Sequence, residues 1–397
     1  MFARMTLALA ASTAFSQTFQ VDVVPTAMTK QTDWKYTTSE PPPAWSTQAY
    51  DDAAWGSGPG GFGATGTPGS VIGTVWSDSS IWMPKTFLIT NPAAKAGLAL
   101  LINHDENVEV YVNGVQVFSE SDYTVRYMQH ELWADAQAAF KDGENLLAVH
   151  CKQTLGGQYI DVGIVESITG AGTPLVGDAR GQAATWKYTT VDPASTSWID
   201  PDFADAGWST GKGGFGNNPA LAAATGTPWE TDDIWMRQTF ALPAKGFNWF
   251  GLSINHDDDA QVYLNGMRVA LLSGNHTHPY GMGTEYQDLD ITEAAKTALR
   301  PGNNVLAIHC RNLPPNFGQT GPTTQYLDAS LSAAILGAAA SLPPIHPVAG
   351  NATPKGPRFY AWRPGQGRLL VGIPGQSYRR FDLIGKSARA VPRWAQP

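Results

Sequence analysis

The chain has 397 residues, of which 43% are hydrophobic and 15% charged, so it can form two or three domains with buried cores and is not globally disordered. Its 41 Gly and 28 Pro predict many turns and a β-rich fold, and its two Cys exclude a disulfide scaffold. Residues 355–397 carry a net charge of +8 and the preceding residues −16, which excludes general nucleic-acid binding by the acidic body. No apolar run reaches the roughly 18 residues that a membrane-spanning helix needs, so we expect no transmembrane segment.

Residues 1–16 have the features of a signal peptide. One positive charge at Arg4 precedes a short apolar stretch, and Ala14 and Ser16 place small residues ahead of a cleavage site before Gln17. We therefore expect a secreted or cell-surface protein whose first mature residues, 17–31, form a lead-in segment. The alternative is a disordered N-terminal helix of a cytosolic protein.

The middle of the chain contains the same domain twice. Residues 34–38 (WKYTT) recur at 186–190, and many further matches follow in the same order. We expect two domains, repeat 1 (32–167) and repeat 2 (184–335), joined by a linker (168–183). The matched segments are Trp45 and Trp198, Trp55 and Trp208, 60–63 and 213–216 (GGFG), Trp76 and Trp229, 81–83 and 234–236 (IWM), 103–105 and 255–257 (NHD), and 158–159 and 325–326 (QY).

Each copy has the pattern of a β-sandwich. Short β-rich runs occur at 98–102, 109–112 and 146–151 of repeat 1. An Asn-Gly pair at 113–114, repeated at 265–266, predicts a hairpin turn, because Asn-Gly readily adopts positive φ. We expect one helical turn in each copy, at 131–140 and 291–299. Several short strands with turn signals and little helix predict sandwich packing.

The order of these motifs resembles the galactose-binding-like jelly roll that is the sugar-binding domain of family 2 glycoside hydrolases. The resemblance covers both repeats and implies an all-β fold: two tandem β-sandwich domains plus a small β-rich C-terminal tail. It also implies carbohydrate binding. In that family the domain precedes a catalytic (β/α)₈ barrel of about 250 residues. The stretch after repeat 2 is too short for one, so we expect no inherited catalysis.

The repeated NHD segments carry the first candidate binding residues. Carboxylate and amide side chains hydrogen-bond paired sugar hydroxyls, and their oxygens also suit calcium. The alternative is a polar turn, because neighbouring residues on a strand point to opposite faces. The candidates for carbohydrate binding here are Asp105, Glu106, Asp257 and Asp258, with Gln158 and Gln325 of the QY segments.

Aromatic residues provide the second set of candidates. Trp76 and Trp229 lie between turn signals, where a ring can stack on the apolar face of a sugar. Tyr280 lies in an extra loop of repeat 2, and such insertions often carry binding specificity. The alternative for each tryptophan is packing in the core, which we expect for Trp82 and Trp235.

Histidine and cysteine pairs also recur. His104 and His150, with the equivalent His256 and His309, could share one sheet surface and bind a metal together with Asp105 or Asp257. Cys151 and Cys310 follow histidines, but neighbours on a strand diverge, so we expect core packing rather than a nucleophile. We expect no cofactor, with calcium as the one alternative.

The C-terminal region divides into an Ala/Pro/Gly-rich linker (336–357) and a basic tail (358–397) with short strands. The tail resembles C-terminal sorting tails of Gram-negative secreted proteins, which implies a partner in the secretion machinery or at the cell surface. The alternative is a small hairpin that packs on repeat 2.

These observations favour a secreted, non-catalytic protein that binds polysaccharide or glycan. Two alternatives stay open. One is a structural or cell-surface assembly module without a sugar ligand. The other is an accessory part of a glycoside hydrolase, or a cryptic glycoside hydrolase built between the domains. Exposed tryptophans would favour sugar binding, whereas buried ones would favour the structural module.

Overall fold

The structure is a computed structural model that describes residues 16–95, 97–274, 285–313 and 324–337, together with four strands between 358 and 390. The chain divides into two compact units, 1–344 and 345–397, and the first contains both repeats. The fold is mostly β, in largely antiparallel sheets, as the sequence predicts. Within the described ranges no helix is both long and apolar enough to cross a membrane.

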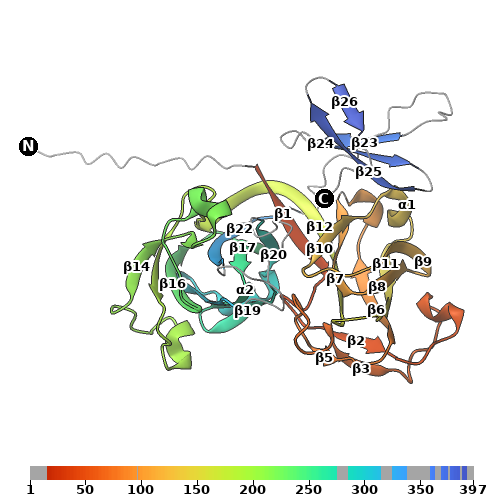
Figure 1. The fold of residues 1–397 in the computed structure, drawn as a ribbon, viewed down its shortest axis with the longest axis horizontal. Helices are drawn as coiled ribbons and strands as arrows, with labels where there is room; N and C mark the ends of the chain where they lie inside the picture. Colours follow the sequence, from red (N-terminus) through yellow and green to blue (C-terminus); the bar gives the residue numbers. More distant parts are fainter. Residues whose placement is uncertain are drawn as a thin grey trace, which may run out of the picture. The chain divides into compact units, whose positions relative to one another are not determined.

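One sheet extends through both repeats (Figure 1). Its strands follow the order β10-β7-β12-β22-β17-β20, so β12 of repeat 1 pairs directly with β22 of repeat 2. Four further strands join this path at β12, β22 and β4. The bounds are β10 (Met128–Glu131), β7 (Leu98–Asp105), β12 (Tyr159–Val176), β22 (Tyr326–Ala334), β17 (Trp249–Asp257), β20 (Gln287–Asp290), β1 (Ser16–Val24), β4 (Phe62–Gly63), β5 (Thr74–Val75) and β15 (Phe215–Gly216).

A second sheet in each repeat packs against the shared sheet. Alternating residues of its strands are buried, as in β8, where the valines enter the core and the polar residues between them are half-buried. The order is β6-β11-β8-β9 in repeat 1 and β14-β13-β16-β21-β18-β19 in repeat 2. The bounds are β6 (Ser80–Ile89), β11 (Gly143–Lys152), β8 (Asn107–Val112), β9 (Val115–Glu120), β14 (Ser209–Lys212), β13 (Thr185–Thr189), β16 (Asp233–Leu242), β21 (Gly302–Arg311), β18 (Asp259–Leu264) and β19 (Met267–Leu272).

Short elements complete unit 1. The expected helical turns are present as α1 and α2, at equivalent places in the two repeats. Trp34 of β2 and Trp186 of β13 are buried, so the WKYTT segments help to close the two cores. The bounds are α1 (Ala134–Gln137), α2 (Thr292–Ala298), the 3₁₀ helices η1 (Pro43–Ser46), η2 (Pro92–Ala94), η3 (Thr196–Ile199) and η4 (Pro219–Ala224), and the hairpin strands β2 (Asp33–Tyr36) and β3 (Gly56–Pro59).

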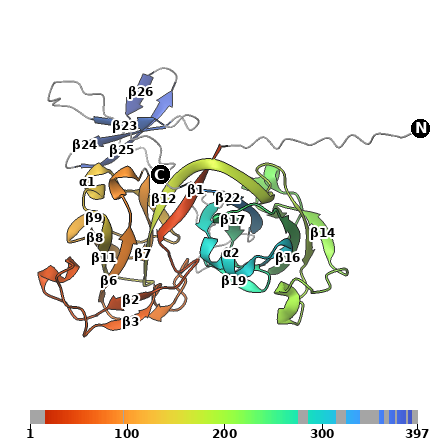
Figure 2. The ribbon, with the colours of Figure 1, turned by 180° about the vertical axis from the view of Figure 1, so that it is seen from behind.

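Strand β12 belongs to both repeats. Its first part pairs with β7 and β1, and its last part, from Gly172 to Val176, pairs with β22. Residues 168–176, which the sequence indicates as linker, are therefore strand, visible as the long yellow ribbon in Figure 1 and from behind in Figure 2. A Cβ on Gly170 or Gly172 would lie 3.1 or 3.2 Å from ring carbons of Phe19. The glycines at these positions leave space for the Phe19 ring and do not form a turn. The domain boundaries themselves stay predictions.

The Asn-Gly turns are confirmed. Asn113 and Gly114 have φ values of 51° and 85°, and Asn265 and Gly266 have 47° and 89°. Both residues of each pair therefore adopt the left-handed conformation that a tight hairpin turn requires. The two turns connect β8 to β9 and β18 to β19.

The two cysteines are buried free thiols, and the expected core packing is confirmed. Burial raises the pKa of the Cys151 thiol, and the same holds for Cys310. Each sulfur is 3.9 Å from a backbone oxygen, that of Tyr159 or Asp257. Neither thiol therefore has the lowered pKa of a reactive nucleophile.

The second unit contains an antiparallel sheet in the order β23-β24-β25-β26. Its strands agree with the β-rich runs that the sequence predicts for the tail. The role of this tail in sorting or anchoring stays a prediction. The bounds are β23 (Arg358–Trp362), β24 (Arg368–Ile373), β25 (Gln376–Ile384) and β26 (Ser387–Ala390).

Candidate functional site

The candidate site lies where the chain crosses from one sheet to the other. In repeat 1, β7 ends at Asp105 and β8 of the facing sheet begins at Asn107, so Glu106 alone connects them. In repeat 2, Asp258 alone connects β17 to β18. The Asp105–Glu106 and Asp257–Asp258 peptide bonds are both cis. We call each of these two dipeptides an acidic corner.

Neighbouring backbone groups fix the acidic corner of repeat 1. His104 Nδ1 is 2.5 Å from the backbone oxygen of Glu106, so the ring donates to this carbonyl. The Glu106 carboxylate accepts a hydrogen bond of 3.0 Å from the backbone N–H of Leu155. Burial, followed by the charge of Glu106, raises the pKa of Asp105 to about 6. At neutral pH the Asp105 carboxyl group is therefore mostly ionised.

A loop with an exposed aromatic ring lies beside this corner. The backbone of Thr124 donates to the carbonyl of His104, at 2.7 Å, and Tyr123 forms an isolated antiparallel bridge with Asp105. Residues directly opposite in such a pair have Cβ atoms about 5 Å apart on the same face. Tyr123 is 53% exposed and Asp105 is 7% exposed. Tyr123 is therefore the cross-strand neighbour of the buried Asp105, and it is itself largely exposed to solvent.

Gly157 completes the surface next to Asp105. A Cβ at this position would lie 2.3 Å from the Asp105 Oδ2 atom, so a side chain would displace the carboxylate. On the same loop, Leu155 is 80% exposed. Repeat 1 thus has two buried carboxylates with an exposed aromatic and an exposed aliphatic residue at their rim.

The acidic corner of repeat 2 is closed. Asp257 and Asp258 are 0% and 2% exposed, and the Oδ1 atom of each has no hydrogen-bond partner. Their other oxygens accept from Thr324 Oγ1, at 3.5 Å, and from the Leu313 N–H, at 2.6 Å. Burial, followed by the charge of Asp258, raises the pKa of Asp257 to about 9. The two repeats therefore differ at the same site.

The predicted glutamines hold the loops around the corners. Gln158 Nε2 donates to the carbonyl of Asp78, at 2.6 Å, and Gln325 Nε2 donates to that of Thr231, at 2.8 Å. Both residues are buried: Gln158 is 8% exposed and Gln325 is 1% exposed. In this structure they fasten backbone segments and do not project toward solvent.

The predicted tryptophans are packed inside. Trp76 and Trp229 are each 2% exposed and belong to the cores of repeats 1 and 2. Neither ring therefore offers a face to a sugar in this structure. Trp82 is half-buried and Trp235 is 9% exposed, each stacked on a histidine. Tyr280 lies outside the described residues.

The expectation that the paired histidines share one sheet surface is wrong. His104 and His256 lie in the shared sheet, whereas His150 and His309 lie in the facing sheets. The latter two stack on tryptophans, with ring centroids 4.6 Å apart in each pair. The carboxylates next to them are Glu109, 3.2 Å from His150, and Asp233, 2.7 Å from His309. The structure therefore does not bring His150 and His104, or His309 and His256, to one ion with Asp105 or Asp257.

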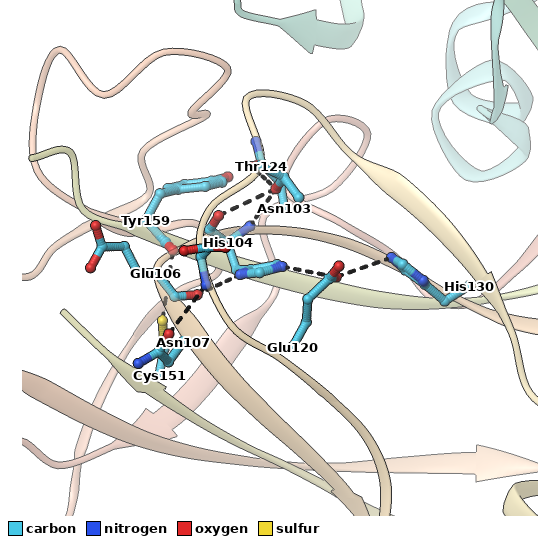
Figure 3. Close-up of polar contacts among 10 residues, drawn as sticks. Asn103, His104, Glu106, Asn107, Glu120, Thr124, His130, Cys151 and Tyr159 are labelled. Atoms are coloured by element: carbon cyan, nitrogen blue, oxygen red, sulfur yellow. Dashed lines mark hydrogen bonds and ion pairs between the residues drawn. The ribbon is translucent and has the colours of Figure 1, made fainter. Parts of the chain in front are cut away.

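Sequence reasoning missed three residues near the corner of repeat 1: Tyr123, Glu120 and His130. Glu120 lies between the rings of His104 and His130 (Figure 3). Repeat 2 has no equivalent motif for any of the three, so the comparison of the two copies gave no signal for them.

No protein family model matches the chain. An α-L-rhamnosidase from Streptomyces avermitilis is 26% identical to it over 300 residues, which cover 72% of this chain and 26% of that protein. A family 2 glycosyl hydrolase from Bacteroides cellulosilyticus matches 72% of this chain and 31% of its own chain, with 13% identity and a TM-score of 0.26. The match to the structure of S. avermitilis α-L-rhamnosidase complexed with L-rhamnose covers 90% of this chain and 28% of that chain, with 17% identity and a TM-score of 0.20.

The chain spans about a quarter of the length of the curated relative that it matches. It resembles non-catalytic β-sandwich regions of glycoside hydrolases, and the likeness is distant. The fold itself rests on the strand pairing and the cores of this chain.

Proposed function

We propose that this chain is a secreted, non-catalytic carbohydrate-binding protein and that repeat 1 binds a glycan at its acidic corner. One observation carries the proposal: Tyr123, which is 53% exposed, lies opposite Asp105 in an isolated antiparallel bridge. The resemblance to glycoside hydrolase regions supports the same ligand class.

The chemistry of the corner suits a sugar. An aromatic ring stacks on the apolar face of a pyranose, and carboxylate oxygens accept hydrogen bonds from adjacent hydroxyls. Asp105 and Glu106 supply the acceptors, and Leu155 adds apolar contact at the rim. Two carboxylates repel an acidic sugar. The ligand we propose is therefore a neutral polysaccharide or glycan, bound at the acidic corner of repeat 1.

A structural or cell-surface assembly module is the second candidate, and the burial of the tryptophans favours it. None of the ten tryptophans that recur between the repeats is exposed. A sandwich whose aromatic residues all serve packing needs no sugar ligand. The exposed Tyr123 is the feature that this second candidate does not explain.

Calcium would fit the corner of repeat 2 better than that of repeat 1. Asp257 and Asp258 each keep one buried oxygen without a partner, and calcium prefers such oxygen ligands. There it would neutralise the two carboxylates and stabilise the closed corner. In repeat 1 the Glu106 carboxylate already accepts a hydrogen bond from the Leu155 N–H, so we expect no ion there and expect EDTA to leave glycan binding unchanged.

Replacing Tyr123 at the rim and Asp105 of the corner tests the sugar-binding proposal. Tyr123→Ala removes a stacking surface and is expected to weaken binding about tenfold, the equivalent of roughly 1.4 kcal/mol. Asp105→Asn removes a charged acceptor and is expected to weaken it about tenfold or more. Binding is measured on insoluble polysaccharides and on a glycan array, with and without EDTA.

Trp133→Ala is the matched control, because this aromatic residue is 37% exposed and lies at α1, away from the corner. It is expected to bind like the wild type. Loss of binding in all three variants would point to misfolding, which thermal unfolding detects. If the wild-type chain binds no glycan at all, the assembly module becomes the better description.

A further inference from the structure

The loop that carries Tyr123 meets the equivalent segment of repeat 2. In repeat 1 this loop, 121–127, connects β9 to β10, and in repeat 2 the longer segment 273–286 connects the equivalent strands β19 and β20. Gly274 lies near the start of the repeat 2 segment and Glu285 near its end, and both contact repeat 1. The two repeats are therefore in contact beside the proposed glycan site.

At Gly274 the contact is between backbones. A Cβ at this position would lie 2.6 Å from the Gly69 Cα atom and 3.3 Å from the Val125 oxygen, and Gly274 has a φ of 124°. A Cβ on Gly69, where φ is 74°, would in turn lie 2.1 Å from the same oxygen. Backbone atoms cannot rotate away as the end of a side chain can, so a side chain at Gly274 would push the two repeats apart at this point. The Val125 carbonyl is therefore packed against one segment of its own repeat and one segment of the other.

Gly274 is fixed within repeat 2, and an ion pair adds a second contact between the repeats. The Gly274 N–H donates to Asp259 Oδ1, at 3.1 Å, where β18 begins. Arg126 Nη1 donates to Glu285 Oε2, at 3.3 Å, and these two side chains are 13% and 67% exposed. An ion pair with so exposed a carboxylate contributes little. The backbone contact at Gly274 is therefore the main one.

Hydrogen bonds within repeat 1 connect this contact to Tyr123. Asn103 Nδ2 donates to the Gly69 carbonyl, at 2.8 Å, and Asn103 Oδ1 accepts from Thr124 Oγ1, at 2.9 Å (Figure 3). The Thr124 N–H also donates to the carbonyl of His104, at 2.7 Å. Because Tyr123 is itself 53% exposed, its place depends mainly on the loop backbone that these neighbours hold.

We propose that repeat 2 is the support that positions Tyr123 for glycan binding by repeat 1, through the contact of Gly274 with Gly69 and Val125. The proposal rests on the function proposed above. A loop that is ordered before the ligand arrives loses less conformational entropy on binding, so the support increases affinity without touching the sugar. Gly274 is then a positioning residue, and the two repeats form one binding unit rather than two independent sites.

Gly274→Ala in the full chain tests the proposal. Its methyl group would meet the Gly69 backbone and is expected to displace the 121–127 loop, so that hydrogen–deuterium exchange in this loop becomes about fivefold faster or more. Binding to a polysaccharide that retains the wild type is expected to weaken about threefold to tenfold. Glu285→Gln is a milder variant that removes the ion pair, and it is expected to weaken binding by up to about threefold.

Gly302→Ala is the matched control. Gly302 also lies in repeat 2 and has a positive φ, of 86°, but no described atom outside its chain neighbours lies within 4 Å of a Cβ at this position. The control therefore carries a similar backbone cost without the contact, and it is expected to leave both exchange in 121–127 and glycan binding unchanged. Thermal unfolding shows whether each variant is folded.

Exchange and binding are measured separately, so that failure of the support is distinguished from failure of the proposed function. The support is overturned if the wild type binds a glycan and the folded Gly274→Ala variant matches it in either measurement. It is also overturned if Gly302→Ala has the same effects as Gly274→Ala. A wild-type chain that binds no glycan overturns the proposed function, and the role of repeat 2 in binding with it, whatever the exchange rates.

Discussion

A repeat 2 protein that begins at residue 184, the predicted boundary, is expected to unfold roughly 10 °C below one that begins at residue 168. Both proteins end at residue 337 and both lose repeat 1, so they differ only in 168–183. That segment contains the last part of β12, from Gly172 to Val176, which pairs with β22. Without it β22 loses a partner strand along its edge.

Two contacts account for most of the expected loss. Val176 is 3% exposed, and burying such a side chain contributes about 1.5–3 kcal/mol. The fully buried Asp328 accepts a hydrogen bond of 2.7 Å from the backbone N–H of Ala179. Removing a bond to a buried charged group costs about 1.5–3 kcal/mol. The sum is a large part of the roughly 5–15 kcal/mol that stabilises a domain.

Circular dichroism melting curves of the two proteins measure the difference. A third protein that begins at residue 177 separates the contributions, because it keeps Ala179 but lacks the strand. Equal melting temperatures for the first two proteins would mean that β12 is dispensable for repeat 2 and that 168–183 serves only as a linker.

Much of the fold could be predicted because the chain is duplicated and its turns are local. Asn113 and Asn265 each determine a hairpin through their own φ preference, which needs no distant contact. The bridging part of β12 could not be predicted in the same way. This segment is rich in Ser, Thr, Gly and Pro and lacks the alternation of apolar and polar residues that marks a strand. The need for glycine at position 170 comes from the ring of Phe19, which lies in a strand about 150 residues earlier.

The candidate site was predicted less completely than the fold. The acidic corners were found because Asp105 and Asp257 recur with their neighbours at a constant offset. A tryptophan can line a binding pocket or pack in a core, and the sequence pattern around it does not distinguish the two. The burial of Trp76 could therefore not be predicted. Tyr123 and Glu120 reach the corner through strand pairing that single-sequence patterns do not encode.

Asp257→Asn is expected to stabilise repeat 2 at pH 8 in the absence of divalent metal, by roughly 1–3 kcal/mol. Asp257 is fully buried and its Oδ1 atom has no partner. Burial and the adjacent Asp258 raise its pKa to about 9 in the folded chain, whereas an unfolded aspartate has a pKa of about 3.9. Asparagine has nearly the same shape and no charge to bury, and its amide can donate to the unpartnered oxygen of Asp258.

The pH dependence of the stability of repeat 2 follows from this difference between the folded and unfolded pKa of Asp257. Between about pH 4 and pH 9 the folded chain holds one proton more at Asp257 than the unfolded chain does. Stability from this group is therefore highest near pH 4 and decreases as the pH rises, by at most about 1.4 kcal/mol per unit. Above about pH 9 both states are ionised and the slope ends. Asp257→Asn removes this slope, whereas Asp105→Asn in repeat 1 removes one that ends near pH 6.

Melting temperatures of the full chain in EDTA, measured from pH 5 to pH 9, show whether Asp257 is protonated or ionised in the folded chain. The wild-type transition of repeat 2 is expected to fall with rising pH, and the Asp257→Asn transition is expected to change less. A variant that melts below the wild type at every pH would show that Asp257 is ionised and stabilised in the folded chain. Added calcium then identifies the cause, because a cation held by Asp257 and Asp258 would raise the wild-type transition and leave the variant unchanged.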